Sequence, residues 1–297
     1  MWLKERISQG IVEIFLSQIE KGYKIEIKNS NYFFALNKNL THPSLLYFNH
    51  QTGDDLLMMF YLLLKYLPQR KNVIIPTALN YLHFFSQYPH YVLGVELAKI
   101  VTNYQMVPII QSYRLTKENQ KEGQRLSLDL FRRLKNELRN DESQAITVAL
   151  FPEGHRSLTG KLLPAEPGVG LMVRMFPDEG WILPIALRYP KNIRHGLNYN
   201  RGIKTEVSIC CGPLTNVSTI REQAESFNFS GKRDSAFFSH FLMWQLAKNL
   251  PEERRGVYRD DFLERTFRGD FELKINPEDN RVGVWDKVSN SFLPDIY

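Results

Sequence analysis

The sequence predicts an α/β protein whose central sheet is mostly parallel and has helices on both faces. Short apolar runs rich in β-branched residues alternate with longer segments whose apolar residues recur at helical spacing, a pattern typical of parallel strands joined by helices. The 297 residues, 43% hydrophobic and 24% charged, have the composition of a globular protein without repeats or linkers. We therefore expect one domain over residues 1–297, with its core at about 44–212 and a C-terminal helix and charged tail over 236–297.

An amphipathic helix is expected at the N-terminus. Within residues 2–20, apolar side chains recur three or four positions apart and would form one face of a helix. These apolar residues are Leu3, Ile7, Ile11, Ile14, Phe15 and Ile19. With Trp2 and a basic start, this face would suit a membrane surface. Packing on the protein's own core is the more common arrangement, and we favour it.

The other elements follow in order along the chain. Strands are expected at Ser44–Phe48, Asn72–Ile75, Met106–Ile110, Ile146–Phe151, Trp181–Leu187 and Thr205–Cys211. Helices are expected at Asp54–Tyr66, 91–102, Gln124–Arg139 and Ala236–Leu250. Several of the strands are apolar and β-branched runs, as in a sheet that is buried on both faces. A charged tail is expected from Pro251 onward.

The formal net charge of +6 and the pI near 9.1 favour an anionic partner. That partner could be nucleic acid, a lipid surface or a phosphorylated substrate. The sequence contains no helix-turn-helix, zinc-finger spacing or aromatic ribonucleoprotein motif. Nucleic acid is therefore disfavoured as a partner.

The cysteines and the apolar runs indicate the compartment. Cys210 and Cys211 are the only cysteines, and neighbours in a strand point to opposite faces, so a reducing compartment without disulfides is expected. The longest apolar run, Leu56–Leu64, has nine residues, whereas a membrane-spanning helix needs about 20. Charged residues near the N-terminus do not fit a secretory signal. We therefore expect a cytoplasmic protein.

The first motif with chemical potential is Asn-His-Gln-Thr-Gly-Asp-Asp at residues 49–55, where the strand Ser44–Phe48 passes into a helix. A carboxylate on one ring nitrogen of a histidine fixes its tautomer and stabilises the imidazolium, so Asp55 would make His50 a general base. The helix N-terminus would offer N–H groups to a developing oxyanion. A chance pairing, with the aspartate as a helix cap, is the alternative.

The second motif is Phe-Pro-Glu-Gly-His-Arg-Ser at residues 151–157, again after an apolar strand. Carboxyl ends of parallel strands meet at one edge of a sheet, so we expect both motifs to line one crevice. Arg156 would bind a phosphate or carboxylate. Glu153 would hold Arg156 or accept a substrate hydroxyl, and Gly154 would permit close approach of a backbone. A polar turn with a surface ion pair is the alternative.

Both motifs resemble those of the glycerolipid acyltransferases, typified by bacterial 1-acylglycerol-3-phosphate acyltransferase. The family's Asn-His-x4-Asp block is similar to Asn49–Asp55, and its Phe-Pro-Glu-Gly-Thr-Arg-Ser block is similar to Phe151–Ser157. Its late Val-Pro-Val block is similar to Leu183–Ile185. The resemblance covers roughly residues 49–187.

The resemblance implies a reaction and roles for the residues. His50 would deprotonate an acceptor hydroxyl that attacks an acyl thioester directly, and Asp55 would orient its ring. Glu153, Gly154 and Arg156 would form the acceptor-binding turn. The resemblance also implies that no metal or other cofactor is needed. The co-substrate would be a thioester of coenzyme A or acyl carrier protein, the acceptor a lysophospholipid or glycerol phosphate, and the location the anionic inner face of the membrane, as a peripheral protein.

Two departures from the family pattern concern the acceptor. His155 stands where the family usually has threonine, which alters contacts in the turn rather than the mechanism. Gln111 aligns with the family's phosphate-binding arginine, and Arg114, three residues on, is expected to reach the same pocket. The alternatives are therefore a lipid alcohol without phosphate as the acceptor, or a catalytically silent lipid-binding module.

Overall fold

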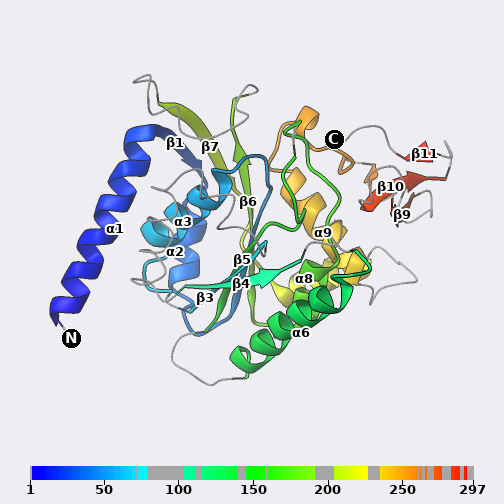
Figure 1. The fold of residues 1–297 in the computed structure, drawn as a ribbon. Helices are drawn as coiled ribbons and strands as arrows, with labels where there is room; N and C mark the ends of the chain where they lie inside the picture. Colours follow the sequence, from blue (N-terminus) through cyan, green and yellow to red (C-terminus); the bar gives the residue numbers. More distant parts are fainter. Residues whose placement is uncertain are drawn as a thin grey trace.

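In the computed structural model, an eight-stranded sheet lies between two layers of helices (Figure 1). The structure describes residues 2–70, 72–78, 104–110, 116–139, 145–157, 159–190, 204–226, 235–259, 261–262, 265, 271–275, 282–287 and 291–292. The strands are β1 (Tyr23–Lys28), β2 (Ser44–Phe48), β3 (Val73–Ala78), β4 (Gln105–Ile109), β5 (Thr147–Leu150), β6 (Trp181–Arg188), β7 (Thr205–Cys211), β8 (Thr215–Asn216), β9 (Phe271–Ile275), β10 (Val282–Asp286) and β11 (Ser291–Phe292). The helices are α1 (Trp2–Gly22), α2 (Asn31–Asn37), α3 (Asp55–Tyr66), α6 (Gln120–Glu137), α7 (Gly168–Met175), α8 (Val217–Ser226), α9 (Ser235–Ala247) and the 3-10 turn η3 (Glu252–Arg254).

β2 lies at the centre of the sheet, whose strand order is β1-β7-β6-β2-β5-β3-β4, with β8 paired to β6. β2 is parallel to β5 and β6, and β3 is parallel to β5 and β4. β1 is parallel to β7, and the antiparallel pairs of the described sheet are those of β6 with β7 and with β8. The predicted mostly parallel sheet is confirmed. As predicted, Cys210 and Cys211 in β7 are free thiols.

Each face of the sheet carries its own hydrophobic core. Leu46 and Phe48 of β2 belong to the core shared with α1, α2 and α3. Leu45 and Tyr47 point the other way, to the core shared with α6, α7, α8 and α9, as alternation along a strand requires. Figure 1 shows the two groups of helices on opposite sides of the sheet. Burial of β2 on both faces agrees with the unbroken apolar run Leu45–Phe48 in its sequence.

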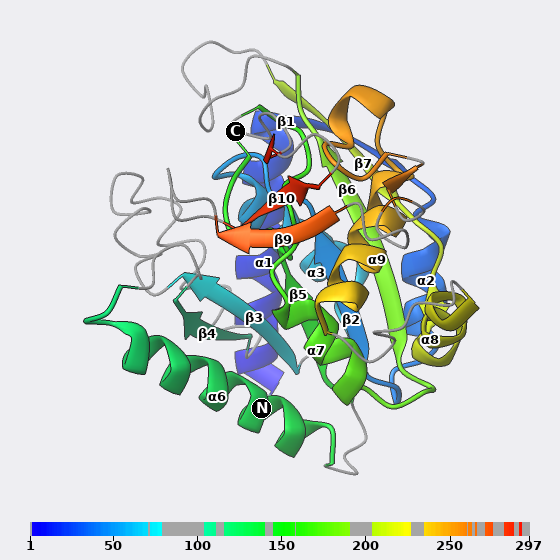
Figure 2. The same cartoon turned by 90° about the vertical axis from the view of Figure 1, so that its right-hand side faces the viewer.

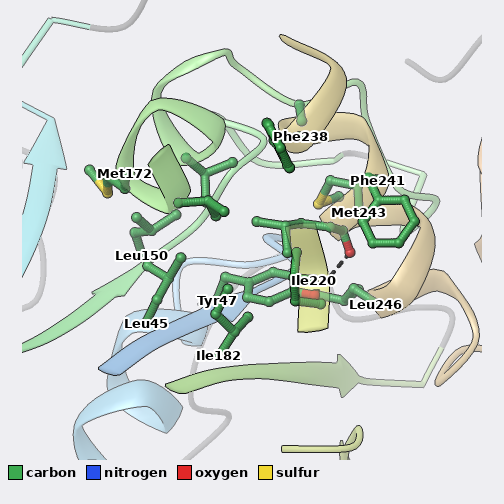
Figure 3. Close-up of a cluster of buried hydrophobic side chains, with 14 of the residues drawn as sticks. Leu45, Tyr47, Leu150, Met172, Ile182, Ile220, Phe238, Phe241, Met243 and Leu246 are labelled. Atoms are coloured by element: carbon green, nitrogen blue, oxygen red, sulfur yellow. Dashed lines mark hydrogen bonds between the residues drawn. The ribbon is translucent and has the colours of Figure 1, made fainter. Parts of the chain in front are cut away.

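Tyr47 and Gly170 tie α9 to the rest of the core shared with α6, α7 and α8. Figure 3 shows Tyr47 of β2 among the apolar side chains there, and its hydroxyl donates to the carbonyl of Leu242 at 3.0 Å. Gly170 of α7 lies directly against α9, because a Cβ on this residue would be 1.8 Å from the carbonyl oxygen of Ser235. The N–H of Gly170 also donates to Oγ of Ser239 at 2.9 Å.

Most expected strands and helices are present, with ends shifted by a few residues. β3 runs three residues past its predicted end, through Pro76. It pairs with β5 only at Val73 and Ile74, so the missing N–H of Pro76 removes no hydrogen bond from that ladder. The helix expected at 91–102 lies outside the described residues.

The N-terminal helix α1 packs on the protein's own core, as favoured from the sequence. Ile19 is buried, and Val12, Phe15 and Leu16 pack against the core shared with α3. Ile14, which the periodicity placed on the same face, is 64% exposed. None of the helices that the structure describes is long and apolar enough to span a membrane.

The segment after α9 differs from the charged tail that the sequence predicted. Arg254, Val257, Tyr258 and Phe262 are buried in it. Further along, β9, β10 and β11 form a separate three-stranded antiparallel sheet, of which Figure 2 shows β9 and β10 side by side. The sequence did not indicate these buried residues and strands, because they are short and lie among charged residues, where periodicity is weak.

Candidate active site

The two motifs meet at the carboxyl ends of β2 and β5, as the sequence predicted. The strand register pairs Tyr47 with Leu150, so His50 and Glu153, three residues further on, lie at matching positions. The N–H of His50 donates to Oε1 of Glu153 at 2.6 Å. The N–H of Ser157 donates to the carbonyl of His50 at 2.7 Å. The second motif therefore holds the backbone of the histidine on both sides.

His50 and Asp55 form a hydrogen-bonded pair. Nδ1 of His50 lies 2.8 Å from Oδ2 of Asp55, whose side chain is fully buried, whereas the His50 side chain is 19% exposed. Because the carboxylate is an acceptor, we assign the proton to Nδ1, which leaves a lone pair on Nε2. This is the tautomer that a general base requires.

Hydrogen bonds from the turn before α3 hold the Asp55 carboxylate. Its Oδ2 accepts from the N–H groups of Gln51 and, at 2.8 Å, Thr52. Oγ1 of Thr52 donates to Oδ1 of Asp55 at 3.2 Å and accepts the N–H of Asp54 at 3.1 Å. These three N–H groups are occupied by side chains. These three groups precede the first residue of α3, so the use of N–H groups of the helix N-terminus for a developing oxyanion stays a prediction.

Phe151 and Asn49 fix the position of His50. The imidazole stacks on the ring of Phe151 with centroids 4.3 Å apart and planes 19° from parallel. The buried Asn49 side chain donates to the carbonyl of Leu187 at 2.9 Å and accepts the N–H of the same residue at 2.6 Å. The Asn49 side chain thereby links the end of β2 to β6 next to the histidine. Sequence reasoning missed this role, because a backbone partner has no sequence signature.

Glu153 is fully buried and holds two backbone segments together. Oε1 accepts the N–H of His50, and Oε2 accepts the N–H of Leu163 at 2.7 Å. Burial raises the pKa of the Glu153 carboxyl well above its usual range, and the negative charge of Asp55 adds to this, although both N–H donors act in the opposite direction. The two hydrogen bonds place both carboxyl oxygens of Glu153 against the protein's own backbone.

The next residues of the second motif form a tight turn. Gly154 has φ of +68°, and a Cβ there would lie 3.0 Å from Cγ of Glu166, so the turn requires glycine. His155 and Arg156 are half-buried in the same turn. Arg114 lies outside the described residues, and its place in the acceptor pocket stays a prediction.

A segment from the C-terminal part of the chain packs beside the first motif. Nε2 of Gln51 donates to the carbonyl of Gly160 at 3.1 Å, and Nη1 of Arg254 donates to the same oxygen at 3.4 Å. Nη2 of Arg254 donates to the carbonyl of Tyr189 at 3.5 Å. The N–H of Leu162 donates to the backbone carbonyl of Arg254 at 2.9 Å. Sequence analysis missed Arg254 because it belongs to the segment expected to be a charged tail.

A separate pocket of about 390 Å³ is lined by residues of β6, α8 and α9, among others. Tyr47, Pro184 and Trp244 contribute to its walls, but no residue of 49–55 or 151–157 does. It is therefore distinct from the site around His50. Within the described part of the chain, no cluster of three or more His, Cys, Asp or Glu residues is arranged to hold a metal ion.

Comparisons with known proteins add one match. A family model described as Acyltransferase matches residues 24–188, more than half of the 297 residues. The matched region contains both motifs and ends before the segment that carries Arg254. No similar sequence is found among curated proteins.

Proposed function

Because this chain belongs to the Acyltransferase family, which supports acyl transfer in general, we propose a specific reaction for it. A fatty acyl group passes from a thioester of coenzyme A or acyl carrier protein to a hydroxyl of a lysophospholipid or glycerol phosphate. The observation that carries the proposal is the pair formed by His50 and Asp55, in which a buried carboxylate fixes a partly exposed imidazole.

In the proposed reaction, Nε2 of His50 takes the proton of the acceptor hydroxyl as the acceptor oxygen attacks the thioester carbonyl carbon. The tetrahedral intermediate then collapses, the C–S bond breaks, and the thiolate leaves with the proton that His50 returns. Asp55 stabilises the imidazolium between these steps without taking the proton itself. An ester and a thiol are released, and no group stays on the protein.

Arg156 supports an acceptor that carries a phosphate. It is half-buried in the turn whose next residue, Ser157, donates to the carbonyl of His50. A guanidinium binds two phosphate oxygens through a planar fork of donors. A phosphate held in this turn would keep the acceptor near His50. Arg114 remains part of the proposal as a second phosphate ligand.

Replacement of the catalytic pair tests the mechanism. We expect His50→Ala and Asp55→Asn to lower acyl transfer by about 100-fold to 10,000-fold, the usual effect of losing a positioned base. The measurement is thiol release from an acyl-CoA, with circular dichroism to verify folding. His42→Ala is the matched control, because His42 is half-buried before β2 and outside both motifs. A folded His50→Ala variant with a rate near that of the parent would contradict the assignment of the base.

A panel of acceptors tests the substrate class. We expect the parent to acylate lysophosphatidic acid much faster than the monoacylglycerol that lacks its phosphate. Equal use of both acceptors would reassign the acceptor to a lipid alcohol without phosphate. No transfer to any acceptor by the folded protein would contradict the enzymatic proposal as a whole.

A further inference from the structure

Arg254 is a buried arginine with few partners, next to the candidate active site. Arg254 as a whole is only 9% exposed. It donates two hydrogen bonds, to the carbonyls of Gly160 and Tyr189, at 3.4 and 3.5 Å. Both distances are long for an N–H···O hydrogen bond. None of the ion pairs among the described residues includes Arg254.

Arg70, a second buried arginine of this fold, has more and shorter hydrogen bonds than Arg254, although they involve only its Nη1 and Nη2 and its Nε has no partner among the described residues. It is 2% exposed and donates five hydrogen bonds of 2.8 to 3.3 Å. The acceptors are the carbonyls of Leu36, Asn39 and His42 and the hydroxyls of Ser44 and Thr147. Arg254 has two long contacts in place of five short ones. Its guanidinium therefore keeps donors for a further ligand.

Gly160 leaves space for the guanidinium of Arg254 beside the first motif. It has φ of +73°, and a Cβ there would lie 1.9 Å from Nη1 of Arg254. Any other residue at this position would displace the guanidinium. The carbonyl of Gly160 also accepts a hydrogen bond from Gln51, the residue after His50. Arg254 and Gln51, which follows the proposed base His50, therefore donate to the same carbonyl oxygen.

We propose that Arg254 binds a phosphate group of a substrate of this site. The inference rests on the proposed function, which brings two phosphate-bearing molecules to the site, the acceptor and coenzyme A. A buried guanidinium without a counter-charge is costly, and a phosphate supplies both the charge and the paired oxygens that its fork matches. The segment containing η3 thereby adds a binding residue from outside the matched region 24–188.

The test compares the parent with Arg254→Gln, Arg254→Lys and Arg255→Gln. Arg255 is the matched control, because it is the next residue and donates from Nε to the carbonyl of Leu250. Steady-state kinetics use lysophosphatidic acid or monoacylglycerol as acceptor, and palmitoyl-CoA or palmitoyl-pantetheine as donor. The second member of each pair lacks the phosphates in question. Thermal unfolding with and without glycerol 3-phosphate, against glycerol, measures phosphate binding without activity.

We expect Arg254→Gln to raise the KM of one phosphorylated substrate by roughly 10-fold to 150-fold, the range for loss of a charge-assisted contact. The KM of its unphosphorylated counterpart should change little. A rise for lysophosphatidic acid, with a smaller stabilisation by glycerol 3-phosphate, assigns the acceptor as the source of the phosphate. A rise for palmitoyl-CoA assigns the donor. Arg254→Lys should show a smaller rise in KM, since lysine keeps the positive charge but cannot bind two phosphate oxygens at once. If Arg254→Gln does not fold, the KM values of Arg254→Lys test the inference.

Two results would overturn the inference. One is an unchanged KM for every substrate, and the other is an equal loss with phosphorylated and unphosphorylated molecules, as a purely positioning role of Arg254 would cause. Both presuppose an active parent protein. A parent that transfers no acyl group contradicts the proposed function instead, and the comparison of thermal unfolding with glycerol 3-phosphate then tests Arg254 by itself.

Discussion

Glu153 joins two strand ends through a carboxylate without access to solvent. Both oxygens accept backbone N–H groups, from His50 and Leu163. An amide in the same place could accept only one of these bonds and would turn an NH₂ group toward the other donor. We expect Glu153→Gln to destabilise the protein by about 1 to 3 kcal/mol, the cost of an unsatisfied buried group, and to lower acyl transfer. Denaturant unfolding and thiol release measure the two effects, with the exposed Glu179→Gln as control.

The raised pKa of Glu153 predicts that the stability of the protein depends on pH, and the Glu153→Gln variant tests this prediction. Burial raises the pKa of Glu153 well above the value of 4.5 in the unfolded chain, so the folded state holds this proton more tightly than the unfolded state. Between these two pKa values, stability from this group falls as pH rises. The Glu153→Gln variant has no group that titrates at this position. The difference in unfolding free energy between the parent and the variant should therefore shrink as pH rises through that window. A deficit that grows with pH would contradict the raised pKa.

At the residue scale, the sequence predicted the pairs that are local and missed those that are not. His50 and Asp55 lie in one seven-residue motif, and the structure joins them at 2.8 Å. Asn49 and Glu153 bind backbone atoms of segments brought close only by folding. Every residue carries the same backbone N–H and C=O groups, so these contacts could not be predicted from residue types. Arg156 and Arg114 remain predictions as phosphate ligands.

The contact between α7 and α9 depends on the absence of a side chain. A Cβ at Gly170 would lie 1.8 Å from the carbonyl oxygen of Ser235, so Gly170→Ala must push the start of α9 away. We expect a loss of about 1 to 3 kcal/mol in unfolding free energy, as for other overpacked contacts, although alanine favours helices by about 1 kcal/mol over glycine. Chemical denaturation measures the change.

Gly168→Ala is the control in the same helix, because no atom lies within 4 Å of its added Cβ apart from its chain neighbours and the backbone of the helix itself. It should be neutral or slightly stabilising. A similar loss for both variants would contradict steric contact with α9 as the cause.

At the element scale, strands that are buried on both faces could be predicted from their apolar runs alone. β2 and β5 are buried throughout and were predicted as apolar runs. β1 alternates between buried or half-buried and exposed residues, and its charged residues concealed it. α7 has eight residues and α8 has ten, too few for a clear helical period. The antiparallel direction of β7 was not predicted, because periodicity carries no information on strand direction.

The whole molecule combines a net charge of +6 with no membrane-spanning helix among the residues described. We propose that it attaches reversibly to an anionic membrane surface, as the lipid substrates of the proposed reaction require. Sedimentation with phosphatidylglycerol vesicles should show binding that weakens as salt shortens the Debye length from about 10 Å at 0.1 M to about 3 Å at 1 M. Phosphatidylcholine vesicles are the control. Binding that is equal on both lipids or indifferent to salt would contradict electrostatic attachment.

The contacts of the C-terminal segment also constrain how the protein is made on the ribosome. The loop at Gly160 to Ala165 is held by Arg254 and by the hydroxyl of Tyr258, which accepts the N–H of Ala165 at 2.8 Å. These partners are synthesised more than 90 residues later, about 5 to 20 s at ordinary rates of translation. During that interval the nascent chain has both motifs but not the segment that supports them, and its apolar surface for α9 is uncovered. Acyl transfer should therefore begin only when the chain has emerged from the ribosome beyond Tyr258. Until then the uncovered apolar surface makes the nascent chain a substrate for chaperones.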